Sequence, residues 1–187
     1  MSIWISRFGL ILGLAGCVMA GAPRATPILG GAVNLGVPKG YCIDAAASQV
    51  TGDAAVMIIG RCSDAGGVAP AVITATVGET GSAAVLAAGV PALSGYFMSP
   101  EGRAALSRDG VADAVVVHEI RASEGVMILH LTDRALGDYW RAVMGVRGRL
   151  VTLAVTPPEG QPLTAATAKA LLDKAVLAMQ AANPAAA

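Results

Sequence analysis

The sequence predicts an α+β domain in which a mainly antiparallel, curved sheet carries a C-terminal amphipathic helix packed on it. Short β-rich runs recur along the chain, separated by turns that contain Gly or Pro, as is typical of antiparallel strands. One long helical pattern follows the last of these runs. The chain has 187 residues and no internal repeat, which predicts a single domain over residues 31–184 and a short tail over residues 185–187.

The first expected strands lie between residues 33 and 77. Residues 33–37 are β-rich and end at Pro38-Lys39-Gly40, a turn signal. The continuous apolar run over residues 54–59 predicts a strand that is buried on both faces, and residues 71–77 predict another strand. Residues 83–98 are apolar but are interrupted by Gly and Pro, so the pattern assigns no element there.

A short helix and a β-hairpin are expected next. Ser99-Pro100-Glu101 offers an N-cap serine, a proline at the first helical position and an acid in the first turn, and this helix should end near Gly110. Residues 112–121 and 126–133 then predict the two strands of a hairpin. Gly125 suits the left-handed position of a three-residue loop, Ser123-Glu124-Gly125.

The chain ends with a strand pair and a helix. Residues 139–143 and 149–155 are β-rich, and the segment 157–160 ends the sheet with two prolines and a glycine. From Thr164, a plausible N-cap, to Asn183, which precedes a proline, apolar residues recur at three- and four-residue steps and form one stripe. The stripe consists of Ala168, Leu171, Leu172, Ala175, Val176 and Met179. This helix should pack across the sheet.

The order of these last elements resembles that of a known family. The hairpin is followed by Tyr139-Trp140-Arg141, by Gly148-Arg149-Leu150-Val151-Thr152-Leu153 and by the closing helix. This order, over about residues 111–183, is similar to the end of Mog1/PsbP-like domains, in which a curved antiparallel sheet is flanked by helices. The resemblance implies that fold for this part of the chain. It implies no catalytic residue, because the family shares no catalytic set.

The N-terminus has the pattern of an export signal. Arg7 precedes the apolar run 8–14, and the small residues Ala15 and Gly16 follow, which predicts a signal peptide over residues 1–16. The run closes in Leu14-Ala15-Gly16-Cys17, which resembles the lipobox of bacterial lipoproteins. The resemblance implies that Cys17 is lipidated. The segment from Ala20 to Pro27 is rich in Gly, Ala and Pro, which predicts a tether over residues 17–30. The alternative is an ordinary secretory signal with a chance cysteine at the cleavage site.

Lipidation at Cys17 would place the domain in the bacterial cell envelope, facing the periplasm. Val18 follows the cysteine where an aspartate would be the familiar inner-membrane retention signal, so the resemblance favours the outer membrane. The expected partners are the membrane, through the anchor, and envelope proteins. Nucleic-acid binding is excluded because the formal net charge is +0 and no Lys/Arg cluster exists. No cofactor is expected.

Cysteine usage fits an oxidising compartment. With Cys17 acylated, Cys42 and Cys62 remain as an even pair, which predicts a disulfide. Nineteen residues lie between them, and closing such a loop is worth about 3 kcal/mol in the chain-entropy model. The alternative is a catalytic thiol, which needs a nearby base, and neither histidine is close in sequence.

The two histidines of the chain are His118 and His130. The three-residue loop would place them directly opposite each other on one face of the hairpin, with Cβ atoms about 5 Å apart, and Glu119 would point to the other face. Two such histidines could share a metal, but a catalytic zinc site needs three protein ligands. The alternative is a polar cross-strand pair, and a one-residue register slip would abolish it.

No other motif predicts catalysis. Ala92-Leu93-Ser94-Gly95 lacks the first glycine of a nucleophile elbow, so Ser94 is expected to be a turn residue. The loop glycines at 66–67 and 81 lack the lysine of a phosphate-binding loop. The sequence therefore favours a non-enzymatic binding or assembly module of the envelope. The alternative is a metal-dependent or hydrolytic periplasmic enzyme that uses His118 and His130.

Overall fold

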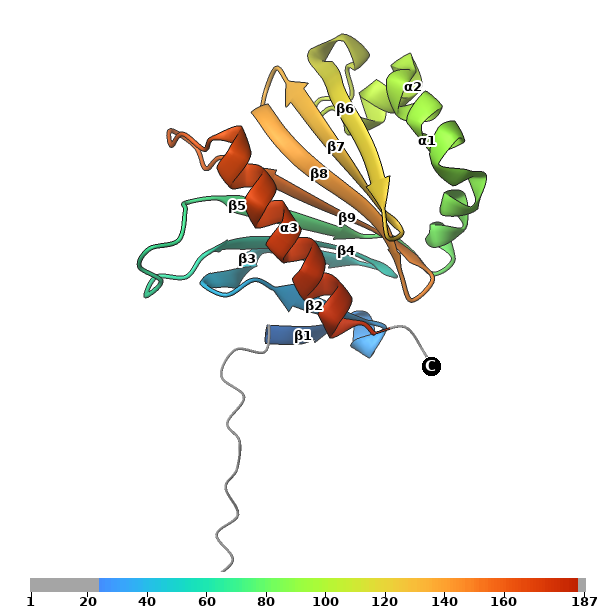
Figure 1. Cartoon of the computed structure of the whole chain (residues 1–187). Helices are drawn as coiled ribbons and strands as arrows, with labels where there is room; N and C mark the ends of the chain where they lie inside the picture. Colours follow the sequence, from blue (N-terminus) through green and yellow to red (C-terminus); the bar gives the residue numbers. More distant parts are fainter. Residues whose placement is uncertain (1–23, 185–187) are drawn as a thin grey trace, which may run out of the picture.

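The computed structural model describes residues 24–184 and confirms the α+β prediction (Figure 1). The predicted signal peptide, Cys17 and the tail over residues 185–187 lie outside the described residues. The described strands are β1 (Arg24–Ile28), β2 (Val33–Val37), β3 (Tyr41–Thr51), β4 (Ala54–Arg61), β5 (Val72–Val77), β6 (Val115–Ser123), β7 (Val126–Asp133), β8 (Gly137–Val146) and β9 (Arg149–Thr156). The α-helices are α1 (Gly89–Met98), α2 (Pro100–Leu106) and α3 (Ala165–Ala182), and short 3-10 helices are η1 (Leu29–Gly31), η2 (Ser82–Ala88) and η3 (Ala112–Ala114).

The strands form two antiparallel sheets. Seven strands follow the order β3-β4-β5-β9-β8-β7-β6, and β1 pairs with β2 in a separate two-stranded sheet. Figure 1 shows the strand directions turning steadily from β3 to β6, as the intrinsic twist of strands requires. The predicted curved antiparallel sheet is therefore present.

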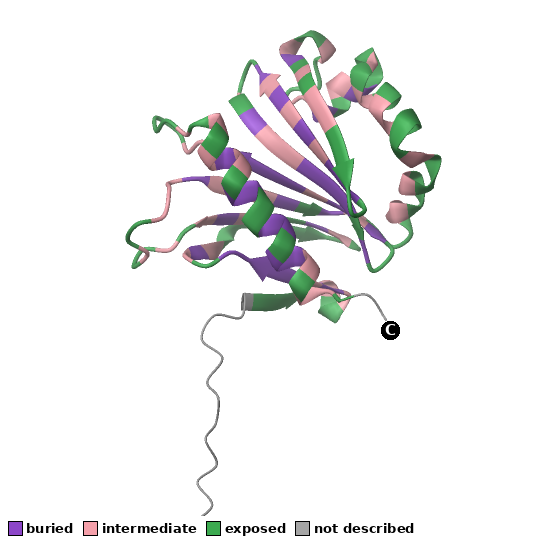
Figure 2. Cartoon of the chain, viewed as in Figure 1, coloured by how far each residue is buried: buried purple, intermediate pink, exposed green. Residues whose placement is uncertain are grey.

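Each face of the large sheet has its own cover. On one face, α3 and β2 bury the side chains of β5 and β9 that include Ile73, Ala75 and Leu153. On the other face, Leu93 of α1 and Leu106 of α2 pack on β7 and β8, while much of the edge strand β3 stays exposed (Figure 2). The alternation of side chains along each strand separates the two cores.

The strand over residues 54–59 differs from its prediction. Strand β4 is present, but its side chains alternate between buried and accessible: Ala55 and Ile59 are buried, whereas Val56 is 40% exposed. The expectation of burial on both faces is wrong. The reason is that the helical cover on that side packs on β6, β7 and β8 and leaves β4 open.

Helix α3 is confirmed and is fixed to β2 at close range. Its predicted apolar stripe is buried along its whole length, and the Thr164 hydroxyl caps its N-terminus. Gly36 of β2 lies against the helix backbone, since a Cβ at this position would be 2.0 Å from the Ala178 carbonyl oxygen. The Asn34 N–H donates to Asn183 Oδ1 at 2.9 Å, and Asn183 Nδ2 donates back to the Asn34 carbonyl at 2.6 Å.

The N-terminal half contains two strands that were not predicted. Residues 24–28 were expected to belong to the tether, but they form β1 and pair with β2. Strand β3 is an exposed edge strand with an irregular register between Asp44 and Gln49. The predicted disulfide between Cys42 and Cys62 is confirmed, with Cα atoms 5.1 Å apart. It closes the open end of the β3–β4 hairpin, where the Cys62 N–H also donates to the Gly40 carbonyl.

The helical region agrees in part with the prediction. The Ser99 hydroxyl accepts the N–H of Gly102 at 3.1 Å and caps α2 as expected, but α2 ends at Leu106, before Gly110. The unassigned residues 83–98 fall in η2 and α1. Ser94 therefore lies within a helix, and its prediction as a turn residue is wrong.

Candidate functional site

The β6–β7 hairpin, which carries both histidines, has a shorter turn than predicted. Ser123 pairs with Val126, so the loop consists of Glu124 and Gly125 alone. Both residues have a positive φ, 52° and 76°, as in the type I′ turns that connect two-residue hairpins. The predicted three-residue loop is wrong, and the register next to the turn is shifted by one residue, with Ile120 opposite Leu129.

A bulge then brings the two histidines together. The register is irregular between Val117 and Glu119, which leaves His118 as the extra residue of β6, and Glu119 lies opposite His130. A bulge places two residues of one strand opposite one residue of its partner. As a result the His118 and His130 rings lie with centroids 5.0 Å apart. The predicted proximity holds, but the direct His118–His130 pairing and the position of Glu119 on the other face are wrong.

Both imidazoles already have partners. His118 Nε2 lies 2.7 Å from Thr132 Oγ1, and His130 Nε2 lies 2.6 Å from Asp138 Oδ1. The His130 ring stacks on Trp140 at 4.3 Å between centroids. Lys169 of α3 holds its Nζ 5.6 Å from the centroid of the Trp140 ring. The histidines therefore belong to a polar and aromatic surface cluster at the end of β6, β7 and β8.

This cluster lacks the donors of a metal centre. Within residues 24–184, no three His, Cys, Asp or Glu side chains come together in a way that could hold a metal ion. A third ligand would be needed for a catalytic zinc site. His118 and His130 lie on neighbouring strands, but His118 sits in the bulge and Glu119 is the residue paired with His130.

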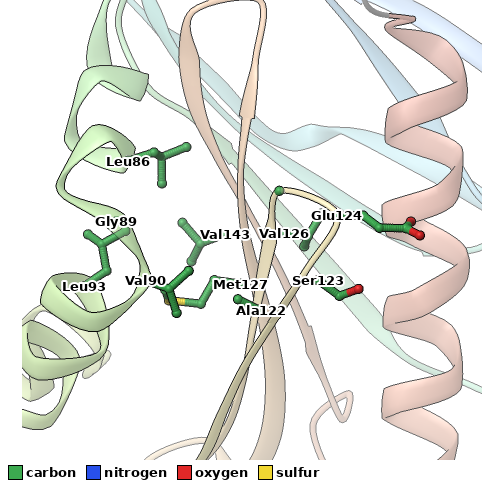
Figure 3. A pocket seen from close by; sticks show the side chains of 11 residues that line it. Leu86, Gly89, Val90, Leu93, Ala122, Ser123, Glu124, Val126, Met127 and Val143 are labelled. Atoms are coloured by element: carbon green, nitrogen blue, oxygen red, sulfur yellow. The ribbon is translucent and has the colours of Figure 1, made fainter.

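A cleft of about 330 Å³ opens between the helices and the β6–β7 turn (Figure 3). Its walls are formed by apolar side chains of η2, α1, β7 and β8, namely Leu86, Val90, Leu93, Met127 and Val143. Glu124 is the one ionisable residue that lines it, and Figure 3 shows its side chain pointing away from η2 and α1, toward the side of α3. The cleft offers a mainly apolar surface, with Ser123 and Glu124 of the turn as the side chains that carry a hydroxyl and a carboxylate.

The helical segment beside the cleft is uncharged and exposed. We call residues Ser82–Met98 the apolar arm; they contain no Asp, Glu, Lys or Arg, and none of them is buried. Several large apolar side chains point into solvent: Val85, Val90, Tyr96 and Met98 are 46–54% exposed. Sequence reasoning left this segment unassigned, although its long lack of charge is a signal that could have identified it.

The apolar arm is not one straight, membrane-length helix. No single helix of residues 24–184 combines the length and hydropathy that crossing a membrane requires; Ser82–Met98 together with Pro100–Leu106 does so by length and composition only, and these two segments meet at an angle of 86°. The first turns of the arm form the 3-10 helix η2. The arm lies along the sheet and packs on it through Leu86, Leu93 and Phe97.

The chain matches no protein-family model, no curated protein and no solved structure. The resemblance to Mog1/PsbP-like domains therefore depends on the order of elements alone and stays a prediction. What is shown is the architecture: an antiparallel sheet with a C-terminal helix on one face and the apolar arm on the other.

Proposed function

We propose that this protein is a lipid-anchored, non-enzymatic binding module of the bacterial cell envelope, and that the apolar arm is the surface with which it contacts an envelope protein. The single observation that carries the proposal is the exposure of an uncharged apolar segment beside an apolar cleft. Monomeric proteins rarely expose contiguous apolar patches of more than a few hundred Å², and larger patches mark interaction sites.

A protein partner fits the arm better than a bilayer surface. Helices that lie in the membrane interface carry Lys and Arg on one face and bulky Trp, Phe or Leu on the other. The arm has neither Lys nor Arg, so it would gain no attraction to anionic headgroups. Its other exposed positions are small residues, including Ala84, Ala87 and Ala92. Small side chains allow a partner backbone to come close.

The location in the envelope is supported by two features of the sequence. The segment ending in Cys17 resembles a lipobox, which implies an anchored and exported protein. The disulfide between Cys42 and Cys62 is of a kind that persists in oxidising compartments. Together they favour a domain that works outside the cytosol, held at the membrane.

Site-specific photocrosslinking in living cells tests this function. A benzophenone side chain at Met98 is expected to form an adduct with a protein. Val85→Asp, which puts a charge on the exposed face of the arm, is expected to lower the adduct yield at least fivefold, because burying an unpaired carboxylate is unfavourable. The measurement is the adduct yield on a gel, with the adduct identified by mass spectrometry.

Two exposed apolar positions away from the arm provide controls. Val50→Asp on β3 should leave the adduct yield unchanged, and a benzophenone at Leu177 on α3 should give no such adduct; these side chains are 58% and 64% exposed. Adducts formed with lipid alone, or a yield that is insensitive to Val85→Asp, would contradict the proposal.

An enzyme built on His118 and His130 is the alternative, and it makes an opposite prediction. We expect the double variant His118→Ala/His130→Ala to retain the adduct at Met98 within twofold, because the cluster lies at the far side of the sheet from the arm and has no third metal ligand in the described region. Metal analysis by mass spectrometry provides the second measurement. Stoichiometric metal in the wild type that disappears in the double variant would support the enzyme instead.

A further inference from the structure

A second cavity, of about 350 Å³, lies on the sheet face that bears the arm but shares no lining residue with the apolar cleft. Its floor spans β5, β9 and β8, and we call it the threonine–arginine groove. Thr76 lies opposite Thr152, and Thr74 lies opposite Ala154, which in turn pairs with Arg141. The remaining lining residues are Arg108, Leu136 and Thr156.

The groove presents hydroxyls and positive charge, and no carboxylate lines it. Four threonines contribute hydroxyls, and Arg108 and Arg141 contribute guanidinium groups. Threonine is common on exposed strands for its β-propensity alone, so the hydroxyls by themselves would indicate nothing. Two arginines without an acid among them are the unusual feature, because like charges repel unless an anion neutralises them.

Arg141 is the side chain that points to a ligand. Its Nε is buried and has no hydrogen-bond partner, although a buried donor without a partner costs about 1–3 kcal/mol. The ion pairs within the described part of the chain involve Arg121, His130, Arg149 and Lys169, and therefore neither arginine of the groove. The planar set of guanidinium N–H donors of Arg141, its fork, is therefore available to an anion.

Arg149 shows how this fold satisfies an arginine that has only a structural role. Its guanidinium donates to the Gly78 carbonyl at 2.9 Å and to Thr80 Oγ1 at 2.6 Å, and it pairs with Asp53. Hydrogen bonding from Arg149, followed by that from Thr80, lowers the pKa of Asp53 to about 2. Arg141 Nε has no hydrogen-bond partner of this kind, and its guanidinium lies over the Tyr139 ring instead.

The walls of the groove are held in place. Buried Asp133 accepts the Arg108 N–H at 3.0 Å through Oδ2 and the Leu136 N–H at 3.3 Å through Oδ1. Burial raises the pKa of Asp133, but these and other backbone N–H bonds outweigh it and leave the pKa lowered. The Arg141 guanidinium lies 5.7 Å from the centroid of the buried Tyr139 ring. These bonds fix the backbone at Arg108 and Leu136, while the Arg108 side chain itself is exposed, and the Tyr139 ring contacts the Arg141 guanidinium.

We propose that the threonine–arginine groove binds the phosphate group of a small phosphate ester. A carboxylate has two oxygens, which one arginine fork satisfies. Two guanidinium groups and four hydroxyls match the three terminal oxygens and the double charge of a phosphate monoester better. The volume of the groove falls at the lower end of the roughly 300–1,000 Å³ of small-molecule sites, which leaves room for a small organic group beside the phosphate. This site is independent of the contact proposed for the arm.

The test follows the Nε–Hε signal of Arg141 by NMR in the purified full chain, held in neutral detergent micelles. Inorganic phosphate and glycerol 3-phosphate are each expected to shift this signal in a saturable way, whereas acetate should bind at least tenfold more weakly. A parallel titration uses micelles doped with phosphatidic acid, a lipid whose headgroup is a phosphate monoester. Binding of glycerol 3-phosphate alone assigns a soluble ester, and binding of the doped micelles through Arg141 assigns a lipid headgroup.

Variants with matched controls make the test decisive, with affinities measured by calorimetry. Arg141→Gln is expected to lower phosphate affinity at least tenfold, and Thr152→Val severalfold. Arg121→Gln and Thr132→Val, on the opposite face, should leave the affinity unchanged. If Arg141→Gln does not fold by circular dichroism, Arg141→Lys keeps the charge and loses the fork, and it should still weaken binding. The absence of saturable binding, equal affinity for acetate, or full affinity in these groove variants would overturn the proposal, whatever the crosslinking at the arm shows.

Discussion

Replacing Cys17 by alanine is expected to abolish acylation of the protein completely. The thiol of Cys17 is the group to which the resemblance to a lipobox implies lipid transfer, and no other residue can substitute for it there. Each buried CH₂ of an acyl chain contributes about 0.8 kcal/mol to membrane binding, so two or three chains anchor a protein stably. The measurement is metabolic labelling with an alkyne fatty acid, followed by mass determination of the N-terminus.

The other cysteines provide the control for this experiment. Cys42→Ser should keep the full acyl label, because Cys42 lies in β3 and pairs with Cys62. Finding an intact Met1 terminus in the wild type, or label that persists in the Cys17→Ala variant, would show that the anchor is not at Cys17. The envelope location would then lose its main support, while the fold of residues 24–184 would be unaffected.

Cys42→Ser is expected to lower the free energy of unfolding by about 3 kcal/mol, because the bridge closes a loop of sequence separation 20 and so restricts the unfolded chain. For a domain of this size the melting temperature should fall by about 6–12 °C. Strand β3 should be destabilised most, since it is an edge strand whose residues are mostly exposed. The disulfide at Cys42 holds the first residues of β3 against the end of β4. Calorimetry in oxidising buffer measures the change.

Reduction of the wild type should reproduce the effect of Cys42→Ser. In the presence of a strong reductant the two proteins are expected to melt together, because the wild type then has no bridge either. If the wild type and Cys42→Ser melted at the same temperature in oxidising buffer, the bridge would not stabilise the domain, and the pairing of β3 with β4 alone would hold the loop. The double variant Cys42→Ser/Cys62→Ser excludes effects of a free thiol at Cys62.

Sequence patterns predicted the elements whose own residues determine them. Strand β2 and the stripe of α3 combine local propensity with burial, the Ser99 cap follows from its local hydrogen bond, and all three are present. Strand β3 was missed because its alanines and polar residues have little β-propensity, and pairing with β4 stabilises it. The hairpin turn was misjudged because Glu124 adopts a left-handed φ of 52°, a conformation that favours glycine.

The sites depend on contacts that no local pattern contains. His118 and His130 lie close together because a bulge compensates for a register that is shifted by one residue. The predicted proximity is therefore correct, although the pairing from which it was predicted is not. The threonine–arginine groove brings Thr74 of β5 together with Arg141 and Thr152 of the much later β8–β9 hairpin. Strand order and register across β5, β9 and β8 are properties of the complete sheet, and they could not be predicted from single segments.

The contacts that Asn34 and Gly36 of β2 make with the C-terminal end of α3 affect the order in which the domain can fold. Asn34 and Asn183 are 149 positions apart. The helix α3 can therefore pack on Gly36 only after both ends of the domain have left the ribosome. While the last turns of α3 are still inside the ribosome, this helix cannot pack on β2, and the core between α3 and the sheet stays incomplete. The larger core of the domain therefore cannot close until α3 has been synthesised, because contacts of such long sequence separation form slowly and late.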